Sequence, residues 1–405
     1  MQDIWRHIHS LLPMRDVARA ACVSSAFLRS WRCHPNLTFS RTTLGVDKKA
    51  YKNGAIARDF PNKVDHILRN HSGIGIEELA VTLPMKTSYN FPCSLLSNGS
   101  GHSIQSLHLA GCALRPTTEL AWLKSLSKVR LQSVYFTGDG LGCLLCNSLA
   151  LEWLEIRCCD GIVRLKVPCV LQRLRYLEVI GCDKLEVIDS KAPNISSFFY
   201  EGDRVQLSLG EALLMEKIHI IFSGAVHYAR AELPSSVPNL KIAAIRSSRE
   251  ITTTPMRHSK FLHLKKLSIA LSTGTFSPGY DYFSLVSFLD ACPSLETLIL
   301  DVSFYSYFYP SNLRKMQGQQ HHKIKSVKIL GFTSARSLIE LTCHSLFRCY
   351  VPIHKTRKCS PLPIDVLMEA QRAVLAIRTY IEPKVPSMVK LCVVELCRRC
   401  HAVEL

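Results

Sequence analysis

The sequence predicts an α/β chain. It begins with short helices, continues as a curved solenoid of stacked units with a parallel sheet on the concave face, and ends in a helix–strand cap. Three observations predict this order. Residues 3–31 carry apolar side chains at helical spacing with a break at Pro13. One apolar motif returns many times between residues 76 and 330. Residues 364–381 share one apolar stripe, and a short apolar strand from Val389 to Leu396 follows.

Composition favours a folded chain with a large core. Hydrophobic residues make up 47% of the 405 positions and charged residues 20%, which excludes wholesale disorder. No run approaches the roughly 18 apolar residues of a membrane span, and the start, Met1-Gln2-Asp3-Ile4, lacks the features of a secretory signal. The count of 17 cysteines is odd and favours free thiols in a reducing compartment. We therefore expect no membrane partner and a cytoplasmic or nuclear location.

The charge balance favours an acidic partner. The formal net charge is +18, but the basic residues are spread along the chain. No stacking-aromatic or DNA-reading motif accompanies them, so we expect no nucleic-acid partner. A basic surface that is simply solvated remains an open alternative.

The repeated motif is L-x-x-L-x-L, with Leu, Ile, Val, Phe or Met allowed at most fixed positions. Most copies start about 20–29 residues apart, which is the spacing of leucine-rich repeats. Cys112, Cys159 and Cys182 fall three residues past the last fixed position, where a buried polar or thiol group bonds the backbone. The copies are Ile76/Leu79/Val81, Ile104/Leu107/Leu109, Leu126/Val129/Leu131, Leu151/Leu154/Ile156, Leu174/Leu177/Val179, Ile195/Phe198/Tyr200, Met215/Ile218/Ile220, Leu240/Ala243/Ile245, Leu264/Leu267/Ile269, Leu295/Leu298/Leu300 and Ile324/Val327/Ile329.

Residues between the fixed positions point into the predicted concave face, because side chains alternate along a strand. Among them Lys128, Arg130 and Arg157 could form a basic zone beside Trp153 and Tyr176. Arginine and aromatic residues are enriched at interface hot spots, so we predict that these five residues contact an acidic segment of a target. An ordinary solvated sheet face is the alternative. The other residues expected on this face are Ser106, His108, Gln132, Glu155, Glu178, Phe199, Lys217, His219, Arg246, Lys266, Asp301 and Lys328.

The first 40 residues carry a more specific pattern. It runs through Asp3-Ile4-Trp5, Leu11-Leu12-Pro13-Met14-Arg15-Asp16, Ala21-Cys22-Val23-Ser24 and Phe27-Leu28-Arg29-Ser30-Trp31. This pattern resembles the F-box of plant, especially grass-type, F-box/leucine-rich-repeat proteins. The resemblance implies a helical bundle that docks on the Skp adaptor of a cullin-RING ubiquitin ligase. The residues implied to bind the adaptor are Ile4, Ile8, Leu11, Pro13, Val23 and Trp31.

The resemblance extends over nearly the whole chain and includes segments such as residues 91–99 and 190–198. It implies an F-box at 1–40, shortened at its N-terminus by loss of the usual Leu-Pro start, then a linker at 41–75. A leucine-rich-repeat solenoid follows at 76–351 and a C-terminal cap at 352–405. Relative to the family, the chain looks short near residue 75 and near residue 350. From sequence alone, packing of Trp5, Phe27 and Trp31 on the rest of the chain is as well supported as a partner-facing role.

The implied function is that of a non-catalytic substrate receptor in an SCF-type ubiquitin ligase. The F-box would hold Skp, and through it cullin, while the repeats hold a target protein that the sequence does not name. One alternative is an adaptor-independent leucine-rich-repeat scaffold, motivated by the shortened start. Another is a receptor gated by a small anionic ligand, although no phosphate-binding loop is present.

The C-terminal residues contain one motif associated with metals. Cys397-Arg398-Arg399-Cys400-His401 matches C-x-x-C-H, the pattern of c-type haem attachment. With Cys392 these residues could also supply zinc ligands, but their spacing is irregular for a structural site. We expect incidental tail residues here, and no catalytic residue, metal or cofactor in the chain.

Overall fold

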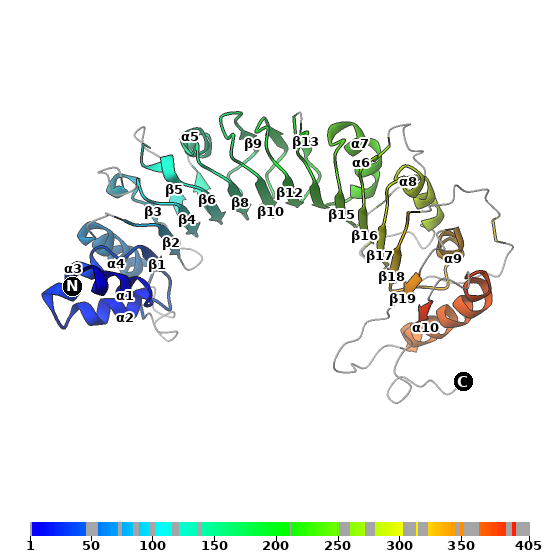
Figure 1. The fold of residues 1–405 in the computed structure, drawn as a ribbon, viewed down its shortest axis with the longest axis horizontal. Helices are drawn as coiled ribbons and strands as arrows, with labels where there is room; N and C mark the ends of the chain where they lie inside the picture. The colour runs from blue at the N-terminus through cyan, green and yellow to red at the C-terminus, as the bar shows by residue number, and fades with distance from the viewer. Residues whose placement is uncertain are drawn as a thin grey trace. The chain divides into compact units, whose positions relative to one another are not determined.

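A computed structural model of the protein divides into two compact units, Met1–Ala212 and Leu213–Leu405. Each unit contains one main parallel sheet, with the segments that connect its strands on one side of it (Figure 1). The structure describes residues 2–45, 56–71, 75–83, 89–96, 102–115, 121–136, 139–210, 212–248, 250, 260–271, 280–302, 313–314, 323–344, 349–351, 364–385 and 391–393.

The main sheet of the first unit is parallel throughout, and each strand pairs with the next copy of the repeat. Its register is unbroken, so that equivalent repeat positions face one another across the strands. The strands in spatial order are β1 (Asn36–Phe39), β2 (Glu78–Thr82), β4 (Ser106–Ala110), β6 (Lys128–Gln132), β8 (Trp153–Arg157), β10 (Tyr176–Ile180) and β12 (Ser197–Glu201).

The fixed positions of the repeat make the core. Within β6, for example, Val129 and Leu131 are fully buried, while the residues between and beside them are partly exposed. Four neighbouring strands, β4, β6, β8 and β10, are each followed by a residue with left-handed backbone: Gly111 (φ 70°), Ser133 (φ 49°), Cys158 (φ 51°) and Gly181 (φ 60°). The N–H of each of these residues donates to the last strand residue of the next repeat, at 2.8–3.0 Å. Glycine accepts this conformation without steric cost, whereas serine and cysteine do not.

The connecting segments add smaller parallel sheets behind the main one, with β9 and β13 above β8, β10 and β12 in Figure 1. Between the layers, the predicted cysteines Cys112, Cys159 and Cys182 are buried, and the last two also form hydrogen bonds with the backbone. The amide of Val134 donates to the Cys159 thiol at 3.4 Å, and the amide of Cys159 donates to the Cys182 thiol at 3.4 Å. The elements of these segments are β3 (Asn90–Phe91), β5 (Ala113–Leu114), β7 (Tyr135–Phe136), β9 (Arg164–Val167), β11 (Val187–Ser190), β13 (Gln206–Ser208), η2 (Cys93–Leu96), η3 (Ala121–Ser125) and α5 (Gly140–Asn147).

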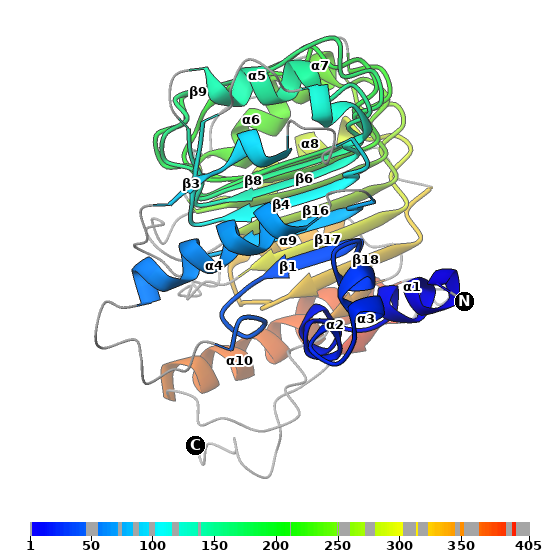
Figure 2. The same cartoon turned by 90° about the vertical axis from the view of Figure 1, so that its left-hand side faces the viewer.

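Three short helices precede the sheet: α1 (Gln2–Ser10), α2 (Met14–Ala21) and α3 (Ser25–Trp31). They contact one another in a small bundle (Figure 2). Helix α2 packs on β1 through Met14 and Val17, which are 7% and 0% exposed. The amide of Thr38, on the outer edge of β1, donates to the Met14 sulfur at 3.3 Å.

The sheet begins earlier than the sequence indicates. Strand β1 lies within the predicted F-box range of 1–40, and helix α4 (Ile56–Asn70) lies within the predicted linker of 41–75. His34, Leu37 and Phe39 occupy the three fixed positions of the motif and are all buried. The motif misses this copy because a histidine stands where an aliphatic residue is expected. The His34 ring replaces apolar packing with hydrogen bonds: its Nδ1 accepts from the Asn36 amide at 3.1 Å.

The main sheet of the second unit is also parallel. Five of its strands coincide with predicted copies of the repeat. Of the last two strands, one lies near residue 350, where the chain looks short relative to the family, and the other is part of the strand predicted from Val389 to Leu396. In spatial order the strands are β14 (Lys217–Ile221), β15 (Ile242–Ser247), β16 (Lys266–Leu271), β17 (Thr297–Val302), β18 (Ser326–Leu330), β19 (Cys349–Val351) and β20 (Cys392–Val393).

In the second unit, the described segments that connect the strands of the main sheet form helices rather than short strands. The helix predicted at 364–381 is present as α10 (Ile364–Ala376) with the π-helical turn η5 (Ile377–Ile381). The described helices include none with the length and apolarity that a bilayer crossing requires. The predicted strand ends at Val389 and Leu396 and the motif at 397–401 lie outside the described residues. The other helices are α6 (Ala225–Ala231), α7 (Leu233–Ser236), η4 (Tyr282–Leu285), α8 (Val286–Asp290), α9 (Arg336–His344) and η6 (Glu382–Lys384).

Candidate functional site

The candidate site lies on the open face of the first unit's sheet, which is the face opposite the connecting segments. Strands β6, β8 and β10 bring together all five predicted target-binding residues. Two glutamates complete the group. We call this group the aromatic–ion cluster, and its members are Lys128, Arg130, Trp153, Glu155, Arg157, Tyr176 and Glu178.

Each arginine of the cluster is paired with a buried carboxylate on the next strand. Arg130 donates through Nε and Nη2 to the two oxygens of Glu155, at 2.5 and 2.9 Å. Arg157 donates through Nε to Glu178 Oε1 at 2.8 Å, and its Nη2 lies 3.7 Å from Glu155 Oε2. The glutamate side chains are 3% and 7% exposed, whereas the arginine side chains are 39% and 41% exposed. The carboxylates therefore lie buried beneath the guanidinium groups, which are the part of each ion pair that solvent or a partner can reach.

Electrostatics favours the ionised forms of Arg130 and Glu155. Burial alone would raise the pKa of Glu155, but hydrogen bonds from Arg130 and Trp153 outweigh burial and hold that pKa below its ordinary value. The hydrogen bond to Glu155 raises the pKa of Arg130. Next to this pair on β4, burial and then the charge of Arg130 lower the pKa of His108. A neutral His108 beside two cations adds no further repulsion.

The aromatic residues form a fixed platform beside the ion pairs. Trp153 and Tyr176 stack with ring centroids 3.6 Å apart and planes 11° apart. Lys128 Nζ lies 5.2 Å from the centroid of the Trp153 ring, within cation–π range. Trp153 Nε1 donates to Glu155 at 2.6 Å, and the Tyr176 hydroxyl donates to Glu178. Two rings locked by packing and hydrogen bonds lose little conformational entropy when a partner binds.

The aromatic–ion cluster is less positively charged than the basic zone that the sequence predicts. The predicted residues are neighbours, but Glu155 and Glu178 compensate the two arginines. Sequence reasoning placed both glutamates on the same face and left them out of the site. A signal for the pairing was present, because Arg130, Glu155 and Glu178 each occupy the position between the last two fixed residues of the repeat. In-register repeats place such residues side by side.

The residues implied to bind an adaptor lie on the three N-terminal helices and the turns between them. Ile4, Leu11 and Val23 are 62%, 73% and 78% exposed, and Ile8 is 41% exposed. Pro13 is exposed, while Trp31 is half-buried and its ring lies 6.1 Å from that of His34. Trp5 is 40% exposed and meets Phe27 edge-on, with centroids 5.0 Å apart. Trp5 and Phe27 thus pack on each other, and part of the Trp5 side chain remains exposed.

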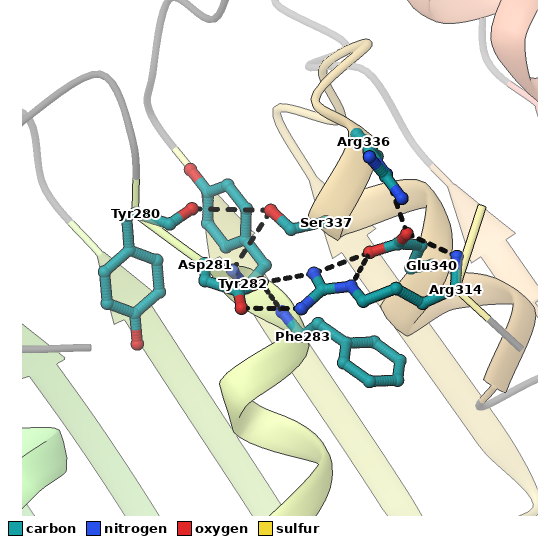
Figure 3. Close-up of polar contacts among 8 residues, drawn as sticks. All are labelled: Tyr280, Asp281, Tyr282, Phe283, Arg314, Arg336, Ser337 and Glu340. Atoms are coloured by element: carbon teal, nitrogen blue, oxygen red, sulfur yellow. Dashed lines mark hydrogen bonds and ion pairs between the residues drawn. The ribbon is translucent and has the colours of Figure 1, made fainter. Parts of the chain in front are cut away.

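A second polar cluster, in the second unit, has a structural role (Figure 3). Arg314 donates to both carboxylate oxygens of Asp281, at 2.8 and 2.9 Å, and through Nε to Glu340 at 2.7 Å. Arg336 donates to the other oxygen of Glu340 at 2.9 Å. Each donor meets an acceptor, which leaves no group poised for chemistry. The cluster ties residues 313–314 to η4 and α9.

The search for a metal centre gives no candidate among the described residues, where no three His, Cys, Asp or Glu side chains converge. Burial raises the pKa of Cys112 and Cys159 to about 12, so these thiols stay protonated. A protonated, buried thiol is neither a good nucleophile nor a good metal ligand. The cysteines described in the first unit's core thus serve packing and backbone hydrogen bonding.

The match to a family model agrees with the repeat architecture. The chain matches the family model described as "At1g61320/AtMIF1, LRR domain" over residues 43–398. A search of curated proteins finds no match. Among solved structures, a match is the leucine-rich-repeat ectodomain of the plant membrane receptor kinase GASSHO1/SCHENGEN3 from Arabidopsis thaliana, in complex with CASPARIAN STRIP INTEGRITY FACTOR 2. Identity is 14% and the TM-score 0.23, and the match covers 71% of this chain and 42% of the ectodomain.

The family model covers most of the chain, and the parallel sheets with one strand per repeat are what such a domain requires. The chain therefore belongs to the family of leucine-rich-repeat proteins represented by the At1g61320/AtMIF1 LRR domain.

Proposed function

We propose that this protein is a non-catalytic substrate receptor of an SCF-type cullin-RING ubiquitin ligase. In this proposal the N-terminal helices bind the Skp adaptor, and the open face of the repeats binds a target protein. Such a receptor performs no bond chemistry. It raises the local concentration of a target lysine near the ubiquitin carrier, which is catalysis by proximity.

The observation that carries the proposal is the asymmetry of the N-terminal bundle. One side of α2 is buried against β1, yet Ile4, Leu11 and Val23 remain more than half exposed. Three large aliphatic side chains exposed within one small bundle favour an interaction surface over a solvated one. Burying each of them against a partner would contribute about 1.5–3 kcal/mol.

The target-binding part of the proposal rests on the aromatic–ion cluster. Its stacked Trp153–Tyr176 pair and its half-exposed arginines have the composition and rigidity of an interface hot spot. Because the arginines are already paired, the cluster suits a target that offers flat or apolar groups to the rings and backbone carbonyls to the guanidinium groups.

Binding to purified Skp adaptor tests the proposal. We expect the full chain to bind the adaptor, and a Leu11→Asp, Val23→Asp double variant to bind at least ten-fold more weakly, measured by biolayer interferometry. A matched control places the same charges at Tyr135 and Leu149, which are 60% and 52% exposed elsewhere in the first unit. Equal binding by both double variants would contradict the proposal.

A second candidate is an adaptor-independent protein-binding scaffold. The observation that favours it is that the family match begins at residue 43, after the three helices. If the full chain fails to bind the adaptor while its open face still selects peptides, the scaffold is the correct function.

A further inference from the structure

The open face of the second unit differs in charge from that of the first unit. In the first unit, Lys128, Arg130 and Arg157 are matched by carboxylates on the same face. These carboxylates are Glu78, Glu155, Glu178 and Glu201. In the described strands of the second unit, the open-face positions carry four cations, Lys217, Arg246, Lys266 and Lys328, against one carboxylate, that of Asp301. We call these four cations the basic open face.

The cations of the basic open face have no carboxylate within ion-pair distance among the described residues. This is not a general property of lysines in the second unit. Lys241, just before β15, pairs with Glu216 at 2.5 Å, and Lys325, just before β18, pairs with Glu296 at 2.6 Å. Two cations just before the strands are thus neutralised, whereas the four on the face have no such pair among the described residues.

The positions between the cations carry mostly small or apolar side chains. In register with Lys217 and Lys266 lies Ile242, and in register with Arg246 lies Ala270. The next row runs from His219 through Ala244, Ser268 and Ile299 to Lys328 and Tyr350. Because the side chains of Ala244, Ser268 and Ala270 are short, the longer cations of the surrounding positions rise above them. A partner bound to the basic open face would contact apolar side chains at its centre and the Lys and Arg side chains around them.

We infer that the basic open face binds an extended acidic segment of a partner protein, with apolar side chains of the segment on the positions between the cations and Asp or Glu side chains on the cations. Charge complementarity is the argument, since unpaired cations on a rigid sheet steer and orient an acidic partner. The inference rests on the target-binding part of the proposed function and gives the second unit a target-binding surface of its own, in addition to the aromatic–ion cluster of the first unit. It remains valid if the chain is a scaffold that binds no adaptor.

Selection from a random peptide display library on the full chain tests the inference. We expect the selected peptides to be enriched in Asp and Glu, with apolar residues between them. A Lys217→Glu, Arg246→Glu, Lys266→Glu triple variant should bind the selected peptides at least ten-fold more weakly in fluorescence anisotropy. The control Arg164→Glu, Lys166→Glu, Lys184→Glu changes net charge equally at exposed positions of the connecting segments. It should change affinity less than two-fold.

Three outcomes would overturn the inference. The first is a selection without enrichment in Asp and Glu, and the second is an equal loss of peptide binding in both triple variants. The third is a single-stranded oligonucleotide that binds the unmodified chain as tightly as the peptides do and loses binding in the first triple variant. The third outcome would mean a general polyanion surface. Thermal melting of both variants confirms that they fold. Adaptor binding by the first triple variant should equal that of the unmodified chain, so failure of the adaptor proposal is a separate result.

Discussion

At the residue scale, the backbone conformation of the residues that follow the strands affects the stability of the first unit. Gly111, Ser133, Cys158 and Gly181 occupy equivalent left-handed positions, and two of the four carry a side chain that opposes this backbone. Glycine would relieve the steric cost, although it also increases the conformational freedom of the unfolded chain.

We therefore predict that Cys158→Gly raises the free energy of unfolding by about 0.5 kcal/mol, because relief of strain slightly exceeds the entropic cost. Gly111→Ala should lower it by about 1–2 kcal/mol, since its Cβ would also lie 3.0 Å from the Leu83 carbonyl oxygen. Urea unfolding of the two variants measures both changes. Two changes of the same sign would contradict this account of the strand ends.

His71 is a second residue with a measurable effect, through pH. Burial lowers its pKa from 6.5 to about 4. A lowered folded-state pKa means that the unfolded chain binds the proton more tightly. The stability contribution is therefore complete above pH 6.5 and is lost as pH falls from 6.5 to about 4.

We expect the melting temperature to fall between pH 7 and pH 4, and to fall less in His71→Gln, which keeps a side-chain donor for the His34 carbonyl. The shift corresponds to at most about 3 kcal/mol over this window. His66→Gln changes an exposed histidine on the same helix and should follow the unmodified chain. Parallel pH profiles for all three proteins would show that His71 is not the group responsible.

At the scale of elements, the aromatic–ion cluster links three strands by their side chains. Glu155 accepts from Arg130 on β6 and from Trp153 on its own strand, and it is nearly fully buried. Removing its charge leaves Arg130 without its carboxylate partner. Because Arg130 is partly exposed, water compensates for part of this loss.

Glu155→Gln should therefore lower the free energy of unfolding by about 1–2 kcal/mol, as measured by urea unfolding. Glu152→Gln, at an exposed position just before β8, is the matched control and should change stability by less than about 0.5 kcal/mol. A Glu155 variant as stable as the control would mean that the ion pairs are incidental to the sheet.

Much of the fold could be predicted from the sequence, because each copy of the motif fixes two buried side chains on one strand. All eleven predicted copies are strands of the two main sheets. Strand β1 could not be predicted in this way, since His34 fills a core position through hydrogen bonds rather than apolar contact. The pairing of Arg130 with Glu155 depends on the register between β6 and β8. The motif predicts which residues of one strand are buried, but by itself it does not predict which residues of neighbouring strands lie side by side.

At the scale of the whole molecule, the N-terminal helices combine two roles in one small bundle. Their buried side covers the edge of β1, where the Met14 sulfur accepts from the Thr38 amide. Open sheet edges promote self-association, so this contact protects the array. Their exposed side carries the residues proposed to bind the adaptor.

The two roles should separate by mutation. Met14→Ala removes buried contacts and uncovers the edge amide, so we expect a loss of about 2–4 kcal/mol in stability and self-association in light scattering. Leu11→Asp, on the exposed side, should weaken adaptor binding and leave both stability and the monomeric state unchanged. Self-association of the Leu11 variant to the same extent would show that the two sides are not independent.

The unbroken register of the first unit has a consequence for the spacing of a target motif. One column of the open face runs through Asn36, Glu78, Ser106, Lys128, Trp153, Tyr176 and Ser197. An extended polypeptide laid along this column advances about 3.3 Å per residue, whereas strands lie about 4.8 Å apart. Three residues of the polypeptide thus span nearly the same length as two strands. Because side chains of an extended polypeptide alternate between its two faces, only every second such match points toward the sheet. Anchor side chains of such a polypeptide would therefore recur at about every sixth position, each meeting about every fourth strand.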